Sequence, residues 1–180
     1  QGLPEGEIVG ALLQHPGADG RIGTEALAKA VSDGYTIAFS GGAMTLAPAV
    51  RKSVPWDPAR HIQPAAQIGG SAYIIAINPS VPARNLAEFI EVARKFRGKL
   101  NAAVGGDATA MALALFGVRS ATHAEAVAYK GTGLAAMAVA SGEVDFGVLN
   151  ATSWAPLVAA GRVRALAVSG EKRLAAFPGV

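Results

Sequence analysis

Residues that could bind an anion recur where the predicted strands of this chain end. Glycine lets backbone N–H groups approach a ligand closely, while hydroxyl and amide side chains add directional hydrogen bonds. Because a predicted helix follows the groups at 105–107, 129–132 and 150, free N–H groups at each helix N-terminus also favour negative charge there. We therefore predict a site for a small acid, built from Ser40, Gly41, Gly42, Gly105, Gly106, Asp107, Thr109, Tyr129, Thr132 and Asn150.

Residue patterns typical of enzymes and metal sites are absent from the sequence. It contains no cysteine, and its three histidines, His15, His61 and His123, are far apart. The stretch 17–23 spaces its glycines as G-x-x-G-x-x-G rather than as the dinucleotide fingerprint, and 69–73 lacks the last glycine of a nucleophile elbow. We predict no catalytic residue, no metal and no cofactor.

Composition narrows the class of protein. The chain has 180 residues, of which 51% are hydrophobic and 6% aromatic, and it is rich in glycine, which favours packed α/β layers over disorder or a β-sandwich. No apolar run reaches the roughly 18 residues that would cross a bilayer. The net charge of +3 comes without a basic stripe interleaved with aromatics, so we predict no nucleic-acid partner.

The elements that must position these residues alternate between strand and helix, which indicates parallel sheets covered by helices. The apolar run 72–77 is typical of a strand buried on both faces, and Asn85 with Glu88 forms a capping-box-like pair at the start of a helix that Gly98 ends. Ligands of open parallel sheets lie beyond the carboxyl ends of the strands. The predicted strands are 8–13, 35–39, 72–77, 101–104, 124–129, 144–150 and 163–168, and the other helices are 23–31, 109–116, 133–140 and 153–160.

Eight short motifs in sequence order carry a family resemblance. They lie at 20–28, 33–36, 55–58, 78–83, 98–101, 129–131, 142–145 and 164–168. Together they resemble the solute receptors of tripartite tricarboxylate transporters, the Bug-type periplasmic substrate-binding proteins. The resemblance implies an α/β fold of the type II periplasmic-binding-protein kind, with two Rossmann-like lobes and a cleft between them. The first lobe would then comprise 1–98, continued by 169–180, and the second lobe 99–168.

The same resemblance implies a function. A receptor of this family binds a small carboxylate in the periplasm and delivers it to membrane transporter subunits, without itself spanning the membrane. Family members begin with a further strand, loop and helix and continue past Val180, so we expect the first lobe to be incomplete in these 180 residues. A ligand-sensing effector domain of a transcriptional regulator is the alternative, and an enzyme comes third.

The candidate pocket departs from the family pattern in its polarity. Ala43, Met44 and Ala110 make it more apolar than is usual, and Asp107 replaces a small neutral residue. Because a carboxylate repels a carboxylate ligand unless it is protonated or bridged, Asp107 has two interpretations. It recognises a cationic group, which would favour an amino acid or a heterocyclic acid, or it caps the helix that starts near Thr109.

Overall fold

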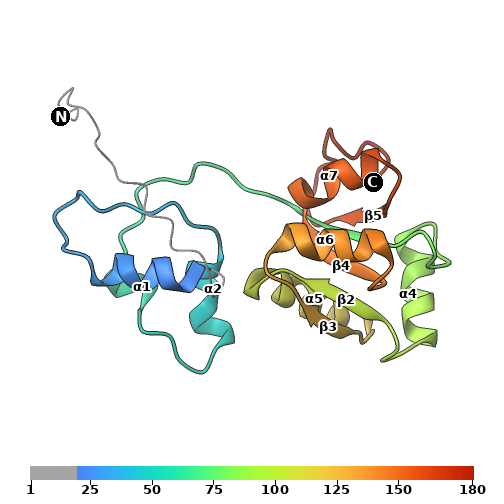
Figure 1. Ribbon diagram of the computed structural model, residues 1–180, viewed down its shortest axis with the longest axis horizontal. Coiled ribbons are helices and arrows are strands. Elements are labelled where there is room, and N and C mark those ends of the chain that lie inside the picture. The colour runs from blue at the N-terminus through green and yellow to red at the C-terminus, as the bar shows by residue number, and fades with distance from the viewer. Residues whose placement is uncertain (1–19) are drawn as a thin grey trace.

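The computed structural model describes residues 20–180, and the predicted strand 8–13 lies outside them. Its helices are α1 (Arg21–Lys29), α2 (Ala43–Val50), α3 (Pro58–His61), α4 (Leu86–Lys95), α5 (Asp107–Ser120), α6 (Thr132–Ser141) and α7 (Ala151–Ala159). Its strands are β1 (Tyr73–Ile77), β2 (Asn101–Val104), β3 (Glu125–Ala128), β4 (Phe146–Asn150) and β5 (Arg164–Val168). The predicted alternation of strand and helix is confirmed from β1 onward (Figure 1).

The five strands form one mixed sheet in the order β3-β2-β4-β1-β5. Strand β2 runs parallel to β3 and β4, as predicted, but β1 runs antiparallel to both β4 and β5. The prediction of a purely parallel arrangement is therefore wrong for β1. An apolar run such as Tyr73–Ile77 indicates that a strand is buried on both faces. It does not distinguish a parallel from an antiparallel strand, because a central strand of either kind is buried in this way.

Helices cover both faces of the sheet, so the core has two layers. On one face, α6 and α7 pack through Val139 and Trp154 against Ile74 and Leu149. On the other face, α4 and α5 pack through Phe89 and Leu113. Alternate residues of one strand serve the two layers, since Ala103 lies in the first and its neighbours Ala102 and Val104 lie in the second.

The predicted capping of α4 is confirmed. The Asn85 Oδ1 accepts a hydrogen bond of 2.9 Å from the Glu88 N–H, and the Glu88 carboxylate accepts one of 2.7 Å from the Arg84 N–H. Phe89 then packs edge-on against Phe146 of β4, with 4.9 Å between ring centroids. The local sequence thus fixes where the helix begins, and its apolar face attaches it to the sheet.

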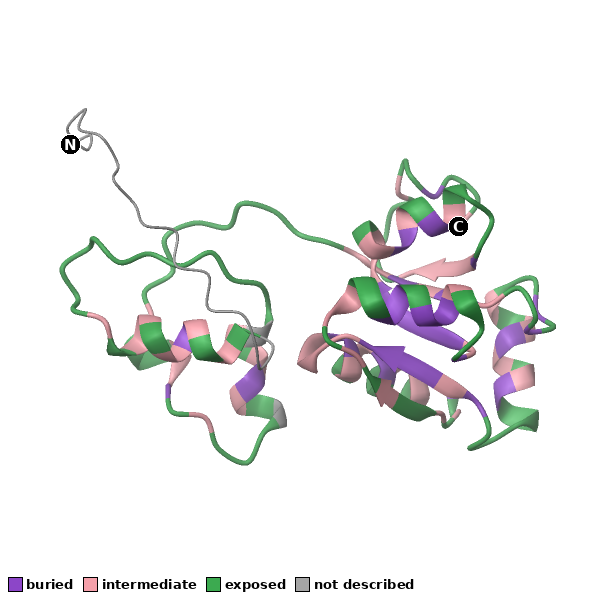
Figure 2. Ribbon diagram, viewed as in Figure 1, coloured by how far each residue is buried: buried purple, intermediate pink, exposed green. Residues whose placement is uncertain are grey.

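Residues 20–72 have little buried apolar surface. The buried residues in this part are Thr24, Ala47 and Trp56, and Figure 2 shows the difference from the sheet. The predicted strand 35–39 is extended chain without a partner, and Tyr35, Ile37 and Phe39 are each more than 85% exposed. A strand needs a neighbour for its hydrogen bonds, and none of the described residues pairs with this segment, so that prediction is wrong here.

Residues on both sides of the predicted lobe boundary at 98 and 99 pack on one sheet. Strand β1 lies between β4 and β5, α4 packs on the same sheet, and Phe177 is buried in its other layer. The bounds 1–98 with 169–180 and 99–168 came from the family resemblance, and alternation along the sequence does not say which sheet a strand enters. An exposed, extended segment, 62–72, joins α3 to β1. The division into two lobes itself stays a prediction.

Candidate ligand site at the strand ends

The predicted site residues of the second half lie along one edge of the sheet. Val104 pairs with Ala128 in the parallel β2–β3 ladder, so both strands end at this edge. Strand β4 ends there too, at Asn150, which is opposite Tyr73 at the start of β1. Helices α5, α6 and α7 begin directly after these strand ends. The topology thus brings three helix N-termini to one edge, as the sequence predicted.

The loops after β2 and β3 approach each other more closely than side chains would allow. A Cβ added to Gly105 would lie 2.5 Å from the Thr132 backbone nitrogen and 2.6 Å from the Gly131 carbonyl carbon. Gly131 has φ of 102°, a conformation that L side chains rarely adopt. These glycines therefore place the N-termini of α5 and α6 next to each other.

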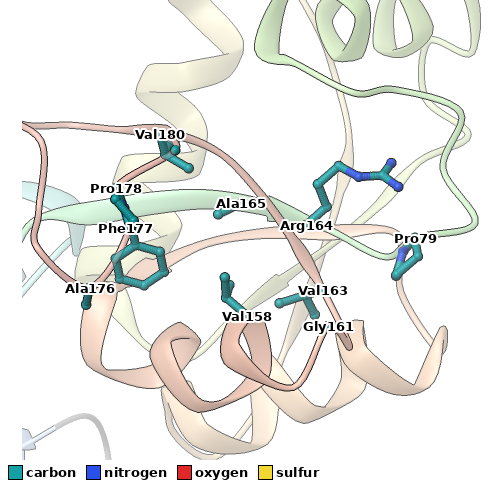
Figure 3. Close-up of a pocket in the computed structure, with 11 residues that line it drawn as sticks. Pro79, Val158, Gly161, Val163, Arg164, Ala165, Ala176, Phe177, Pro178 and Val180 are labelled. Carbon is teal, nitrogen blue, oxygen red and sulfur yellow. The ribbon is translucent and has the colours of Figure 1, made fainter.

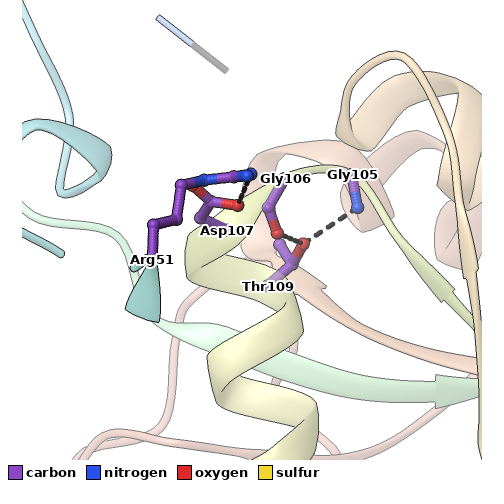
Figure 4. Close-up of polar contacts among 5 residues, drawn as sticks. All are labelled: Arg51, Gly105, Gly106, Asp107 and Thr109. Atoms are coloured by element: carbon purple, nitrogen blue, oxygen red, sulfur yellow. Dashed lines mark hydrogen bonds and ion pairs between the residues drawn. The ribbon is translucent and has the colours of Figure 1, made fainter. Parts of the chain in front are cut away.

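Thr109 fixes the loop before α5. Its hydroxyl accepts a hydrogen bond of 2.9 Å from the Gly105 N–H and donates one of 2.8 Å to the Gly106 carbonyl (Figure 4). The side chain is only 4% exposed. Thr109 therefore holds the Gly105–Gly106 loop in place from a buried position.

Asn150 and Thr132 are connected through Ser153, a residue that the sequence analysis missed. The Ser153 Oγ lies 2.9 Å from the Thr132 Oγ1 and donates a 2.7 Å hydrogen bond to the Asn150 Oδ1. The Asn150 Nδ2 in turn donates to the Thr152 Oγ1 over 2.9 Å. The position of Ser153, three residues after the end of a strand and in the first turn of a helix, could have indicated it.

Asp107 does not cap α5, one of the two roles predicted for it. The N-cap of α5 is Gly106, Asp107 is the first helical residue, and no side chain caps this helix, so the capping interpretation is wrong. Instead the carboxylate forms a two-pronged ion pair with Arg51, which directly follows α2 (Figure 4). No sequence pattern links residues 56 positions apart, so only the fold reveals Arg51 as part of this site.

Tyr129 directs its hydroxyl away from the strand-end loops. It donates a 2.8 Å hydrogen bond to Glu143, which lies beyond the opposite end of α6. Partial burial of the ring and the neighbouring Glu143 carboxylate raise the pKa of Tyr129 above its ordinary value of 10.0. Its backbone N–H donates to the Val104 carbonyl and its carbonyl accepts from the Gly131 N–H, so Tyr129 supports the loop rather than offering a free group to a ligand.

The first predicted group, Ser40, Gly41 and Gly42, is exposed and makes local contacts. The Ser40 hydroxyl donates to the Gly41 carbonyl over 3.3 Å, and Gly42 is the N-cap of α2. Helix α2 contacts α5, so the Arg51–Asp107 pair connects this segment to the other groups. The hydrogen bonds of Ser40 itself do not bring it to Gly105, Thr132 or Asn150.

A cavity of about 440 Å³ lies elsewhere in the fold. It is lined by apolar residues such as Val158, Val163 and Phe177, together with Arg164 (Figure 3). Because Arg164 is opposite Ile77 at the far end of β1, this cavity is at the sheet edge away from Asn150. It contains none of the predicted site residues.

Metal and membrane features were sought within residues 20–180. No group of three or more potential ligands there is arranged to hold a metal ion. Nor does that part of the chain contain a helix with the length and apolarity needed to cross a membrane.

The comparison with known proteins identifies the family. The model of the tripartite tricarboxylate transporter family receptor matches residues 11–180. The chain belongs to this family. Among curated members of the receptor family, protein BugT of Bordetella pertussis is 28% identical over 168 residues, which covers 91% of this chain and 52% of BugT. The chain spans about half the length of the curated relatives it matches.

Solved receptor structures match the fold described above. One, described as a periplasmic transporter, has a TM-score of 0.85 at 31% identity and covers 92% of this chain and 56% of its own. Another, Rpa4515 of R. palustris with adipate, has a TM-score of 0.81 at 28% identity over 87% of this chain and 54% of its own. The predicted fold class, that of the type II periplasmic binding proteins, is thereby confirmed.

Proposed function

We propose that the protein is an extracytoplasmic solute receptor that binds a small organic acid and is not an enzyme. Its ligand would be a carboxylate, as suggested by the similar structure of Rpa4515, which was solved with adipate. The ligand would pass to the membrane subunits of a tripartite tricarboxylate-type transporter, and the protein would act in the periplasm, as a periplasmic transporter with the same fold does.

The observation that carries this proposal is the set of helix starts that lack a side-chain cap. Helices α2, α5, α6 and α7, which follow the four predicted groups, have no side-chain hydrogen bond at the N-cap. Helix α1 also lacks one, while α4, away from the site, is capped by Asn85. Backbone N–H groups in the first turns of the uncapped helices lack intrahelical acceptors, and the helix dipole favours an anion beside them. A carboxylate oxygen satisfies both requirements.

Helix ends alone do not supply enough binding energy. Each contributes about 0.3–1 kcal/mol to an anion at an exposed position. Micromolar affinity requires about −8 kcal/mol. Direct hydrogen bonds from groups such as Thr132 and Asn150, together with exclusion of water, must therefore provide most of the affinity.

Calorimetric titration of the 180-residue protein with adipate and a series of shorter dicarboxylates tests the proposal. We expect saturable binding by at least one of them, and Thr132→Ala to weaken it about tenfold, since a hydrogen bond to a charged group contributes roughly 1.5–3 kcal/mol. Ser141→Ala removes a hydroxyl at the other end of α6 and should leave binding unchanged. Absence of binding throughout the series, or equal losses in both variants, would count against a receptor site at this edge.

A further inference from the structure

The ion pair between Arg51 and Asp107 has the geometry of a strong interaction. The Arg51 Nε lies 2.8 Å from the Asp107 Oδ2, and its Nη2 lies 2.5 Å from Oδ1. Two parallel N–H···O contacts of this kind match the planar fork of a guanidinium to both carboxylate oxygens. Figure 4 shows the pair directly beside Gly106 and Thr109.

The Arg51–Asp107 pair is partly buried and lies at the N-terminus of α5, so its charges affect the candidate site. The Asp107 side chain is 13% exposed and the Arg51 side chain 38%, so solvent screens the pair only in part. Asp107 is the first residue of α5, one of the helices whose N-terminus faces the candidate site. Without its partner, this carboxylate would place a negative charge where a carboxylate ligand is to bind, and like charges at such distances repel.

We propose that Arg51 is a specificity-determining residue of the receptor, an inference that rests on the proposed function. By neutralising Asp107 through the paired guanidinium, Arg51 removes the repulsion that would otherwise exclude dicarboxylates from the N-terminus of α5. The residue thus acts through Asp107 rather than on the ligand. Its location also explains how a receptor for acids accommodates an aspartate beside its ligand site.

A charge cycle on the pair tests this role. Adipate, or the shorter dicarboxylate that binds best, is titrated calorimetrically into the unmodified protein and into Arg51→Gln, Asp107→Asn and the double variant. In a partly hydrated site a neighbouring like charge costs roughly tenfold in affinity, so we expect Arg51→Gln to bind about tenfold more weakly. The double variant should return to within about twofold of the unmodified protein, and Asp107→Asn should bind as tightly or more tightly.

Two controls separate charge from folding. Arg60→Gln removes an exposed arginine that pairs with Asp57 at 3.4 Å on the same half of the chain, and it should leave affinity unchanged. The defect of Arg51→Gln should also shrink as salt is raised from 0.02 to about 0.5 M, since added ions screen the repulsion. A loss that came from a damaged fold would not respond to salt in this way.

Three results would overturn the inference. The first is binding by Arg51→Gln that equals that of the unmodified protein. The second is a double variant that binds as weakly as Arg51→Gln, which would mean that Arg51 contacts the ligand itself or supports the fold. In both cases the proposed function stands while the role of Arg51 falls. Absence of dicarboxylate binding by the unmodified protein would instead remove the proposed function, and this inference with it.

Discussion

Gly105 has the least room for a side chain among the residues of the candidate site. Backbone atoms of Gly131 and Thr132 occupy the space that a Cβ of residue 105 would need. Unlike the end of a side chain, these backbone atoms cannot rotate away. The contact joins the loop after β2 to the start of α6 and so sets the spacing of two helix N-termini. A methyl group here would have to separate them.

We predict that Gly105→Ala destabilises the fold by about 1–3 kcal/mol, the usual cost of overpacking a tight contact. Urea unfolding, followed by tryptophan fluorescence, measures the change. The matched control is Gly133→Ala in the first turn of α6, where an added Cβ meets nothing within 4 Å and helix propensity favours alanine. Equal stabilities of the two variants would show that the loops can separate at little cost.

For individual residues, the sequence predicted the loop glycines and Thr109 of the candidate site, but not Arg51 or Ser153. Glycine and hydroxyl residues after predicted strands can be found by reading along the chain. Arg51 and Ser153 enter the site through tertiary contacts, one across 56 positions and the other through a shared hydrogen bond with Thr132 and Asn150. No local pattern specifies which charged residue will meet Asp107.

Helix α4 shows how much a short stretch of sequence can specify by itself. Asn85 and Glu88 satisfy N–H groups at the start of the helix that would otherwise lack partners. The prediction of this helix from its cap and apolar spacing was confirmed, apart from an end at Lys95 rather than beside Gly98. Segment 35–39 shows the opposite case, because its alternating apolar residues form a strand only beside another strand.

We predict that Asn85→Ala lowers the free energy of unfolding by about 1 kcal/mol, because alanine cannot accept the hydrogen bond from the Glu88 N–H. Thermal and urea unfolding of the variant measure the loss. Glu91→Ala, at an exposed position of the same helix, should change stability by no more than about 0.5 kcal/mol. If Asn85→Ala is as stable as Glu91→Ala, the cap does not contribute to the stability of the fold.

For the molecule as a whole, the alternation of elements predicted the fold class but not the composition of the sheet. Family resemblance and periodicity both indicated α/β layers, and the solved relatives agree. The antiparallel insertion of β1 between β4 and β5 depends on how the chain enters the sheet after residues 62–72, which no local signal records. As a result, the packed unit begins near residue 73.

This packed unit contains both layers of the core. Every buried residue of the two clusters lies between Ile74 and Phe177, while residues 20–72 attach through α2 and the Arg51–Asp107 pair. We therefore predict that the 71–180 fragment folds cooperatively by itself. Its free energy of unfolding should lie within about 2 kcal/mol of that of the intact chain, because the buried apolar area, the main favourable term, stays almost complete.

The fragment carries Trp154 as its single tryptophan, since Trp56 is removed, so fluorescence reports the core directly. Trp154 is fully buried and donates a 3.0 Å hydrogen bond to the Ile74 carbonyl on β1. A 79–180 fragment is the matched control, because it lacks β1 and leaves β4 and β5 without the strand that joins them. We expect buried Trp154 emission and a single urea transition from 71–180, and solvent-exposed emission without a transition from 79–180. If both fragments are unfolded, residues 20–70 contribute far more to the core than their burial indicates.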